Sequence, residues 1–319
     1  MHLGSRIVAG LLCASFALGV TFGTARAEPA APIAFVPLDD RPVTLQLPVM
    51  LGRIAGQRIL PPPRASIGHY LQPGDPEAIL RWLRSPQTAG IGALVASTDM
   101  IGYGGLVASR LPGVSASDAE TRLRALAALK ADRGLPFVGA FGTIMRLAPT
   151  GVPRLGPAAS YYAAGETVDL IAEYANLPDP PRTDEQRSLA ARLRERIGGV
   201  TLDAYLSARG RNRAVDEYVL QLAAEGGFDR IVLGQDDAGP TGLHLKDVAA
   251  LQAAVRRFGL GARASIEPGA DELGMAMLAQ VFARTIRWTP AVRVVYSRAD
   301  AAAFNDQLEF VPIDVTISK

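Results

Sequence analysis

Cysteine is nearly absent from this sequence: its 319 residues include only one, Cys13. Cys13 lies in an N-terminal segment that we expect to be removed, so the remaining chain holds no cysteine. This absence excludes disulfide bonds, thiolate nucleophiles and cysteine-ligated zinc from the expected mature protein. Histidine is almost as scarce, because only His69 and His244 lie beyond that segment. Two histidines are too few for a three-histidine zinc site.

An excess of charge of one sign is also missing. The sequence has 33 basic and 31 acidic residues, and Arg6 and Arg26 belong to the N-terminal segment, so the rest of the chain is formally neutral. Overall charge therefore gives no support for a nucleic-acid partner or for binding to an anionic membrane. Hydrophobic residues make up 49% and charged residues 20% of the sequence, a composition typical of a chain with a substantial core.

Long apolar runs are limited to the N-terminus. Arg6 precedes an uncharged, mostly apolar stretch over residues 7–22, and Ala25-Arg26-Ala27 forms a small-x-small site before Glu28. This order is typical of a cleaved secretory signal, and the stretch is shorter than the roughly 20 residues of a membrane-spanning helix. We therefore predict a signal peptide over residues 1–27, a periplasmic or secreted protein without stable membrane insertion, and a single α/β domain over residues 28–319.

The rest of the chain alternates short apolar segments, rich in Val, Ile and Ala, with longer helical patterns. This alternation is typical of βαβ units and predicts a doubly wound, parallel sheet flanked by helices. An incomplete (β/α) barrel is the alternative, because seven such units would nearly fill one. We expect strands at Ile33–Pro37, Gln57–Leu60, Ala93–Ser97, Phe137–Phe141, Arg230–Gly234, Arg263–Glu267 and Val292–Tyr296.

Helix starts are visible as capping boxes. Ser117 with Glu120, and Thr183 with Gln186, each precede apolar residues at helical spacing, which predicts N-termini at these serine and threonine residues. Helical spacing also covers 247–258 and 270–288, and we expect Trp82 and Trp288 to lie in helices, as core residues rather than sugar platforms.

The segment from 142 to 182 has six prolines and no strand period. We interpret it as a loop excursion, which is either a substrate-facing loop carrying Tyr161 and Tyr162 or a structural insertion.

Acidic residues follow several of the predicted strands. Because the carboxyl ends of parallel strands meet at one edge of a sheet, separate segments would bring these side chains to a common crevice. Each acidic residue alone also has an ordinary explanation, since Asp is frequent in turns and at helix N-termini. The convergence of the set indicates a site, and its members are Asp39, Asp40, Asp99, Asp236, Asp237, Glu267, Asp271 and Glu272.

Clustered carboxylates repel one another, so some of them must be protonated, paired with a cation or bound to a metal. Arg41 and Arg110 are the expected cationic partners. One protonated and one ionised carboxyl group are the parts of a glycosidase, and Asp236, Asp237 and Glu267 are the candidates for acid, base or nucleophile. The same oxygens suit Ca²⁺ or Mg²⁺ equally well. Substrate contacts are expected from Asp39, Asp40, Arg41, Asp99, Tyr103, Arg110, His244, Asp271 and Glu272.

Other motifs give weaker signals. Gly102-Tyr103-Gly104-Gly105 lacks the lysine and the spacing of nucleotide-binding loops, so it is either a ligand-contacting turn or a tight connection that needs positive φ. No G-x-S-x-G elbow of a serine hydrolase occurs in the sequence. His244 follows the Asp236–Asp237 pair and is either an acid/base group or a cap of the next helix. His69 is expected in a surface or packed loop.

Four segments together resemble an uncharacterised bacterial family, domain of unknown function 4127. They are PLDDRPV from Pro37, STDMIGYGGLVASR from Ser97, GQDDAGPTGLH from Gly234 and EPGADELGMAMLA from Glu267. The resemblance implies an α/β protein in which the acidic strand-end motifs form a shared site, and it implies no particular reaction. Members of the family continue past the seventh expected strand, so this chain, which ends at Lys319, is expected to lack their C-terminal part.

We therefore predict an exported hydrolase, most similar in its parts to a glycosidase, acting on a carbohydrate or other small-molecule substrate. The alternatives are a non-catalytic periplasmic carbohydrate-binding protein, a metal-dependent ester hydrolase, and a truncated, inactive chain.

Overall fold

A computed structural model describes residues 30–152, 165–289, 291–298, 300–305 and 309–317. The expected signal peptide over 1–27 and the tyrosine pair Tyr161–Tyr162 therefore lie outside the described residues.

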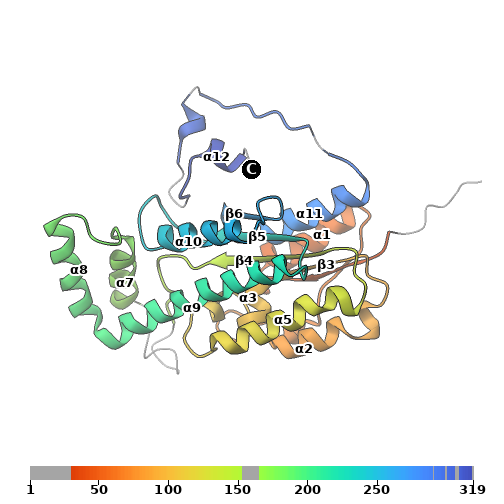
Figure 1. Cartoon of the computed structure of the whole chain (residues 1–319), viewed down its shortest axis with the longest axis horizontal. Coiled ribbons are helices and arrows are strands. Elements are labelled where there is room, and N and C mark those ends of the chain that lie inside the picture. Colours follow the sequence, from red (N-terminus) through yellow and green to blue (C-terminus); the bar gives the residue numbers. More distant parts are fainter. Residues whose placement is uncertain (1–29, 153–164, 290, 299, 306–308, 318–319) are drawn as a thin grey trace, which may run out of the picture.

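Six parallel strands form one open sheet with the order β2-β1-β3-β4-β5-β6 (Figure 1). The doubly wound α/β fold expected from the sequence is confirmed. The barrel alternative is wrong, because β2 and β6 lie at opposite edges and do not pair with each other. The strands are β1 (Ile33–Val36), β2 (Ile59–Leu60), β3 (Ala93–Ser97), β4 (Val138–Ile144), β5 (Arg230–Gln235) and β6 (Ala264–Pro268).

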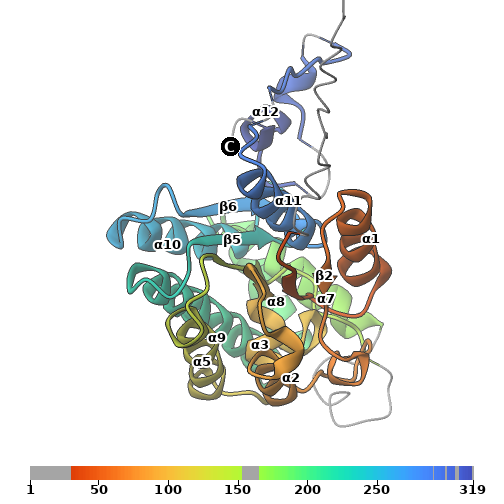
Figure 2. The same cartoon turned by 90° about the vertical axis from the view of Figure 1, so that its right-hand side faces the viewer.

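Helices cover both faces of the sheet (Figure 2). Helices α1 and α11 lie on one face, and α3, α5, α9 and α10 lie on the other, with α2 packed against α3 and α5. The helices are α1 (Leu47–Ile54), α2 (Pro76–Leu83), α3 (Thr98–Tyr103), α4 (Leu106–Ser109), α5 (Ala116–Asp132), α7 (Glu166–Asn176), α8 (Asp184–Ile197), α9 (Gly199–Ala224), α10 (His244–Arg257), α11 (Leu273–Thr285) and α12 (Ile313–Ile317). None of the helices in the described ranges has both the length and the apolar character that crossing a membrane requires.

The strands are buried on both faces, which explains why they are continuous apolar runs in the sequence. In β1, Ile33 and Phe35 belong to the core beneath α1 and α11, whereas Ala34 and Val36 belong to the larger core beneath the opposite helices. Successive side chains of a strand point to opposite faces, so one short segment contributes to two separate cores.

A third apolar cluster lies beside the sheet, between α7, α8 and the first half of α9. Its largest fully buried side chain is Tyr205, whose hydroxyl donates to the backbone oxygen of Leu147 at 2.8 Å. The prediction of a loop excursion over 142–182 is therefore wrong in part, because β4 continues to Ile144 and α7 lies inside this segment. Leu170, Ile171 and Ala175 form the buried face of α7, a helical spacing that the flanking prolines obscured.

Three smaller predictions need correction. No strand forms at Val292–Tyr296: this described segment pairs with none of the described strands, and Val295 is 79% exposed. Trp288 is 57% exposed rather than a core residue, although Trp82 is buried. Helix α5 is capped by Ser115, not Ser117, because the Ser115 hydroxyl accepts from the backbone N–H of Asp118.

The second capping box is confirmed. The Thr183 side chain accepts from the backbone N–H of Gln186, and the Gln186 side chain accepts from the backbone N–H of Thr183.

Candidate functional site

The candidate site lies at the carboxyl edge of the sheet, near the point where the strand order reverses. From β1 the chain goes to β2 on one side, and then to β3 on the other side of β1. The loops after β1 and β3 therefore diverge, and ligands of open α/β sheets bind in the crevice that such divergence leaves. Two neighbouring cavities of about 400 and 420 Å³ occupy this edge and share three lining residues, Arg41, Arg110 and Arg146.

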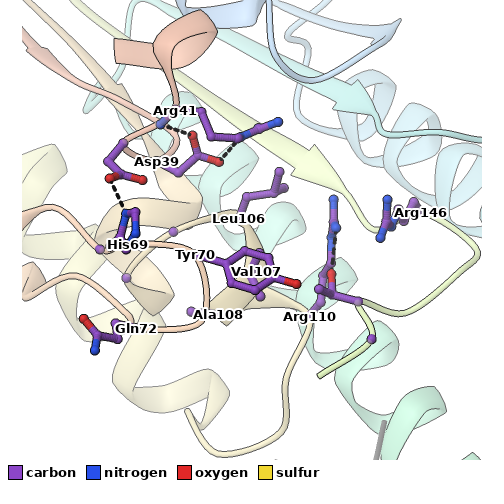
Figure 3. A pocket seen from close by; sticks show the side chains of 16 residues that line it. Asp39, Arg41, His69, Tyr70, Gln72, Leu106, Val107, Ala108, Arg110 and Arg146 are labelled. Atoms are coloured by element: carbon purple, nitrogen blue, oxygen red, sulfur yellow. Dashed lines mark hydrogen bonds and ion pairs between the residues drawn. The ribbon is translucent and has the colours of Figure 1, made fainter. Parts of the chain in front are cut away.

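We call the first of these the switch-point cavity. Its walls come from the loops after β1 and β2, the glycine turn after α3, and residues beyond β4 (Figure 3). Its lining includes Asp39, Asp40, Gly68, His69, Tyr70, Gln72, Gly104–Ala108, Thr150 and Gly151.

We call the second the acidic cavity. It lies where the loops after β5 and β6 approach the arginines, and it is lined by Asp236, Asp237, Gly269–Glu272 and Glu309 in addition to the three arginines. The two cavities together are called the crevice below.

Arg41 joins the two ends of the crevice. Its Nε donates to Oδ2 of Asp39 at 2.8 Å, and its Nη1 donates to Oδ2 of Asp271 at 2.9 Å. A second bond from Nη2 to Oδ1 of Asp271, at 2.5 Å, makes the latter contact bidentate, the geometry that fixes a guanidinium group most firmly. The loop after β1 is thereby connected to the loop after β6, 230 residues later.

Arg110 and Arg146 hold the aspartate pair that follows β5. Arg110 pairs with Asp236, and its Nη1 donates to Oγ1 of Thr150 at 3.0 Å. Both members of this ion pair are buried. Burial raises the pKa of Asp236 by more than the nearby Arg110 lowers it.

Arg146 donates from Nη1 to Oδ2 of Asp237 at 3.2 Å. Asp237 adopts a φ of +26°, a positive value that Asp and Asn adopt more readily than other residues with a side chain. Its carboxylate lines the acidic cavity.

Glu272 faces the same cavity from the loop after β6. Burial, with the nearby charges of Asp271 and Asp236, raises the pKa of Glu272. The acidic cavity thus contains two carboxyl groups with a raised pKa: Glu272, and Asp236, which is also paired with Arg110. Unlike environments of this kind allow one carboxyl group to donate a proton while another accepts one.

Asp99 and Tyr103 lie behind the walls of the crevice. Oδ2 of Asp99 accepts from the backbone N–H of Thr143 at 2.8 Å and from its hydroxyl at 3.2 Å, and burial raises the pKa of Asp99 to about 6. The Tyr103 ring is buried under the guanidinium group of Arg211, 4.6 Å from its centroid. Asp99 and Tyr103 are not among the described residues that line the two cavities.

His244 and Glu267 also lie outside the lining. His244 is the fully buried first residue of α10, where its ring meets the edge of Phe310, and burial lowers its pKa to about 4. Glu267 lies within β6, in register with Gly234, and its charge acts on Arg230. The structure does not bring Asp99, Tyr103, His244 or Glu267 into the described lining of the crevice, whereas the other predicted site residues are there.

Six polar or charged side chains of the described lining were not predicted as site residues: His69, Tyr70, Gln72, Arg146, Thr150 and Glu309. Arg146 comes two residues after the end of β4. A search for basic residues that follow predicted strands, like the one made for acidic residues, would therefore have found it. His69 was expected in a loop, and it is: its side chain is 78% exposed and its Nδ1 lies 2.7 Å from Oδ2 of Asp40. Nothing in the sequence near Glu309 pointed to the site.

The balance of charge limits what the crevice can bind. Seven described acidic residues face three arginines, and each arginine is already paired with at least one carboxylate. A phosphate-binding site depends on cations that are available to the ligand, so this arrangement disfavours an anionic ligand. In the part of the chain that the structure describes, no group of three or more His, Cys, Asp or Glu residues is arranged to hold a metal ion.

Comparison with known proteins identifies the family. No curated protein and no solved structure matched this chain. The model of the family described as "Protein of unknown function (DUF4127)" matches residues 33–319, which include every strand of the sheet and all residues of the crevice. The chain therefore belongs to the DUF4127 family.

Proposed function

We propose that the protein is a hydrolase of carbohydrates and that it cleaves glycosidic bonds in the acidic cavity. The observation that carries the proposal is the set of unlike carboxyl groups there: burial raises the pKa of Asp236 and Glu272, while Asp237 is half exposed and paired with Arg146. A proton donor and a carboxylate in one cavity are the two groups that glycoside hydrolysis requires.

In this proposal Glu272 donates a proton to the glycosidic oxygen as its bond to the anomeric carbon breaks. The Asp237 carboxylate acts on the opposite side, either by attacking the anomeric carbon or by taking a proton from the attacking water. The products are two sugars, one with the proton of the acid and one with the hydroxyl group of water. Glu272 takes the place of Glu267 among the candidates because it lines the acidic cavity.

The remaining polar groups of the crevice suit sugar hydroxyls. Carboxylates of Asp39, Asp40 and Asp271 accept hydrogen bonds from hydroxyl groups, and the arginines between them donate hydrogen bonds to hydroxyl oxygens. Each arginine is also fixed by a carboxylate, so these donors are ordered before a ligand arrives, which lowers the entropic cost of binding.

The test is a turnover screen of the purified protein on soluble polysaccharides and oligosaccharides, with release of reducing ends as the readout. We expect Asp237→Asn and Glu272→Gln each to reduce turnover about 10²–10⁴-fold, the usual contribution of an acid or base group. Glu217→Gln is the matched control, because Glu217 is a partly exposed residue of α9 that pairs with Arg257 and is not among the residues that line the crevice. No turnover on any of these glycans, or full activity in both variants, would contradict the proposal.

A non-catalytic carbohydrate-binding protein is the second candidate. The observation that favours it is that Asp236, Asp237 and Asp271 are each held by an arginine, an arrangement that also suits static hydrogen bonding. In that case the unmodified protein would bind a glycan without cleaving it, and Asp237→Asn would weaken binding only modestly.

A further inference from the structure

An exposed tyrosine stands in the switch-point cavity with no role in the chemistry above. Tyr70 is 61% exposed, although it lines the wall of a cavity. Figure 3 shows its ring near the middle of the cavity, with His69 on one side and Arg110 on the other, and with its hydroxyl directed toward Arg110. Tyrosine is intermediate in its tendency to be buried, and at this position its aromatic ring is open to a ligand inside a polar crevice.

The backbone at Tyr70 is strained. Its φ of +49° lies in the left-handed region, which is uncommon for residues other than glycine, Asn and Asp. Glycine or Asn at this position would avoid most of the strain. A bulky aromatic side chain in this conformation is therefore one that the fold does not require, and residues held in such costly conformations are frequent at ligand-binding sites.

The loop that carries Tyr70 is firmly held. His69 and Gln72 exchange backbone hydrogen bonds of 2.8 and 2.9 Å on either side of it. The backbone N–H of Gly74 donates to the oxygen of Gly104 at 2.8 Å, which fastens the loop to the glycine turn after α3. A ring presented on a rigid loop loses little conformational entropy when a ligand packs against it.

Polar groups surround the ring on the side of the crevice. The His69 imidazole contacts the Asp40 carboxylate next to it, and Asp39 and Arg41 lie beyond. A pyranose ring has an apolar face of C–H groups and a rim of hydroxyl groups, so it matches a flat aromatic surface bordered by hydrogen-bonding side chains. A planar apolar ligand would displace water from these charged groups without offering them hydrogen bonds in return.

We propose that Tyr70 is a stacking platform for one sugar ring, so that the switch-point cavity is a binding subsite next to the acidic cavity. The two cavities share Arg41, Arg110 and Arg146 and are therefore adjacent, and in this proposal one oligosaccharide occupies both. The ligand is an oligosaccharide of at least two residues, with one residue on Tyr70 and its neighbour among the carboxylates. The carbohydrate class of this ligand rests on the proposed function above.

The test uses cello-, xylo-, malto- and chito-oligosaccharides of one to four residues, with affinity measured by calorimetry. For the series that binds, we expect affinity to rise from the monosaccharide to the disaccharide. Tyr70→Ala should remove most of this gain, a loss of about tenfold, and saturation-transfer NMR should detect contact between sugar C–H protons and the protein that Tyr70→Ala weakens. Tyr70→Phe should keep the gain to within about twofold, because the ring remains.

Two further variants separate stacking from folding. Tyr70→Asn removes the ring and tolerates positive φ, so it should reproduce the loss even if Tyr70→Ala disturbs the loop. Trp288→Ala removes another exposed aromatic residue that lies outside the crevice lining and should bind like the unmodified protein.

Failure of this inference is distinguishable from failure of the proposed function. Equal affinity of Tyr70→Asn and the unmodified protein overturns the platform even if the protein hydrolyses a glycan. Binding that depends on Tyr70 without any turnover supports the platform and contradicts the hydrolase. If none of the four series binds to the unmodified protein, the platform is overturned.

Discussion

Single carboxyl groups in this protein differ because their surroundings differ, and Asp99 is the plainest example. It is fully buried behind the crevice, and burial raises its pKa from an ordinary 3.8 to about 6. The folded protein therefore holds this proton up to a higher pH than the unfolded chain does, and the contribution of Asp99 to stability falls as the pH rises from about 4 to about 6.

This linkage predicts a pH-dependent effect of Asp99→Asn. The free energy of unfolding of the variant, relative to that of the unmodified protein, should rise between pH 4 and pH 7 by roughly 2.5 kcal/mol, since each pKa unit corresponds to about 1.4 kcal/mol and the unfolded carboxyl group is already partly ionised at pH 4. Urea unfolding at pH 4, 5, 6 and 7 measures it, and Asp203→Asn on the exposed side of α9 is the control. Parallel pH curves for Asp99→Asn and the unmodified protein would show that Asp99 does not hold this proton.

Glu272 gives a prediction about activity, on the basis of the proposed function. A proton donor is active only while it is protonated, and the pKa of Glu272 is raised above its ordinary value of 4.5. Turnover should therefore fall as the pH rises past this raised pKa, and Glu272→Gln should abolish that alkaline limb in addition to lowering the rate. A pH profile of kcat/KM measures both. An alkaline limb that is unchanged in Glu272→Gln would assign the donor to another group, of which Asp236 is the next candidate.

Among the structural elements, the glycine turn between α3 and α4 has the clearest consequence. Gly104 adopts a φ of +94°, and a Cβ atom there would lie 2.9 Å from the backbone nitrogen and oxygen of Gly74. The sequence predicted that this turn is either a ligand contact or a tight connection that needs positive φ, and the structure shows a tight connection. The turn also holds the loop of Tyr70, through the hydrogen bond from Gly74 to Gly104.

Gly104→Ala should therefore destabilise the protein by about 1–3 kcal/mol, through backbone strain and the clash with Gly74. The matched control is Gly210→Ala in the interior of α9, where a Cβ atom meets nothing within 4 Å. That change should stabilise the protein by about 0.5–1 kcal/mol, because alanine favours helix. Thermal and urea unfolding of the two variants check both signs, and equal effects would refute the role given to the turn.

At the scale of the whole molecule, the crevice is a product of topology. The two cavities lie where the strand order reverses at β1, and they collect residues from the loops after all strands of the sheet, together with Glu309 near the end of the chain. Long-range pairs such as Arg41 with Asp271 and Arg110 with Asp236 connect these loops across more than one hundred residues.

Export is the remaining proposal about the whole chain. We expect residues 1–319, expressed in a bacterium with a periplasm, to yield an exported protein that begins at Glu28, because the small-x-small site ends at Ala27. N-terminal sequencing and intact mass measure this, and Ala27→Arg should prevent cleavage. A protein that retains Met1 and stays in the cytoplasm would contradict the signal peptide.

The sequence by itself determined the parallel α/β sheet, the carboxyl edge as the place where acidic segments meet, and Arg41 and Arg110 as their partners. These follow from short-range patterns: buried strands are continuous apolar runs, and parallel strands place their following loops at one edge. Tertiary structure alone decided which side chains face the crevice. Glu267 lies within β6, where its charge opposes the lowering of the Arg230 pKa by burial, whereas Glu272, five residues later, lines the acidic cavity. Apolar residues at Val292–Tyr296 form no strand, because an apolar run becomes a strand only where it pairs, and this segment pairs with neither edge strand, β2 or β6. Tyr70 and Glu309 reach the site through contacts that no local pattern encodes.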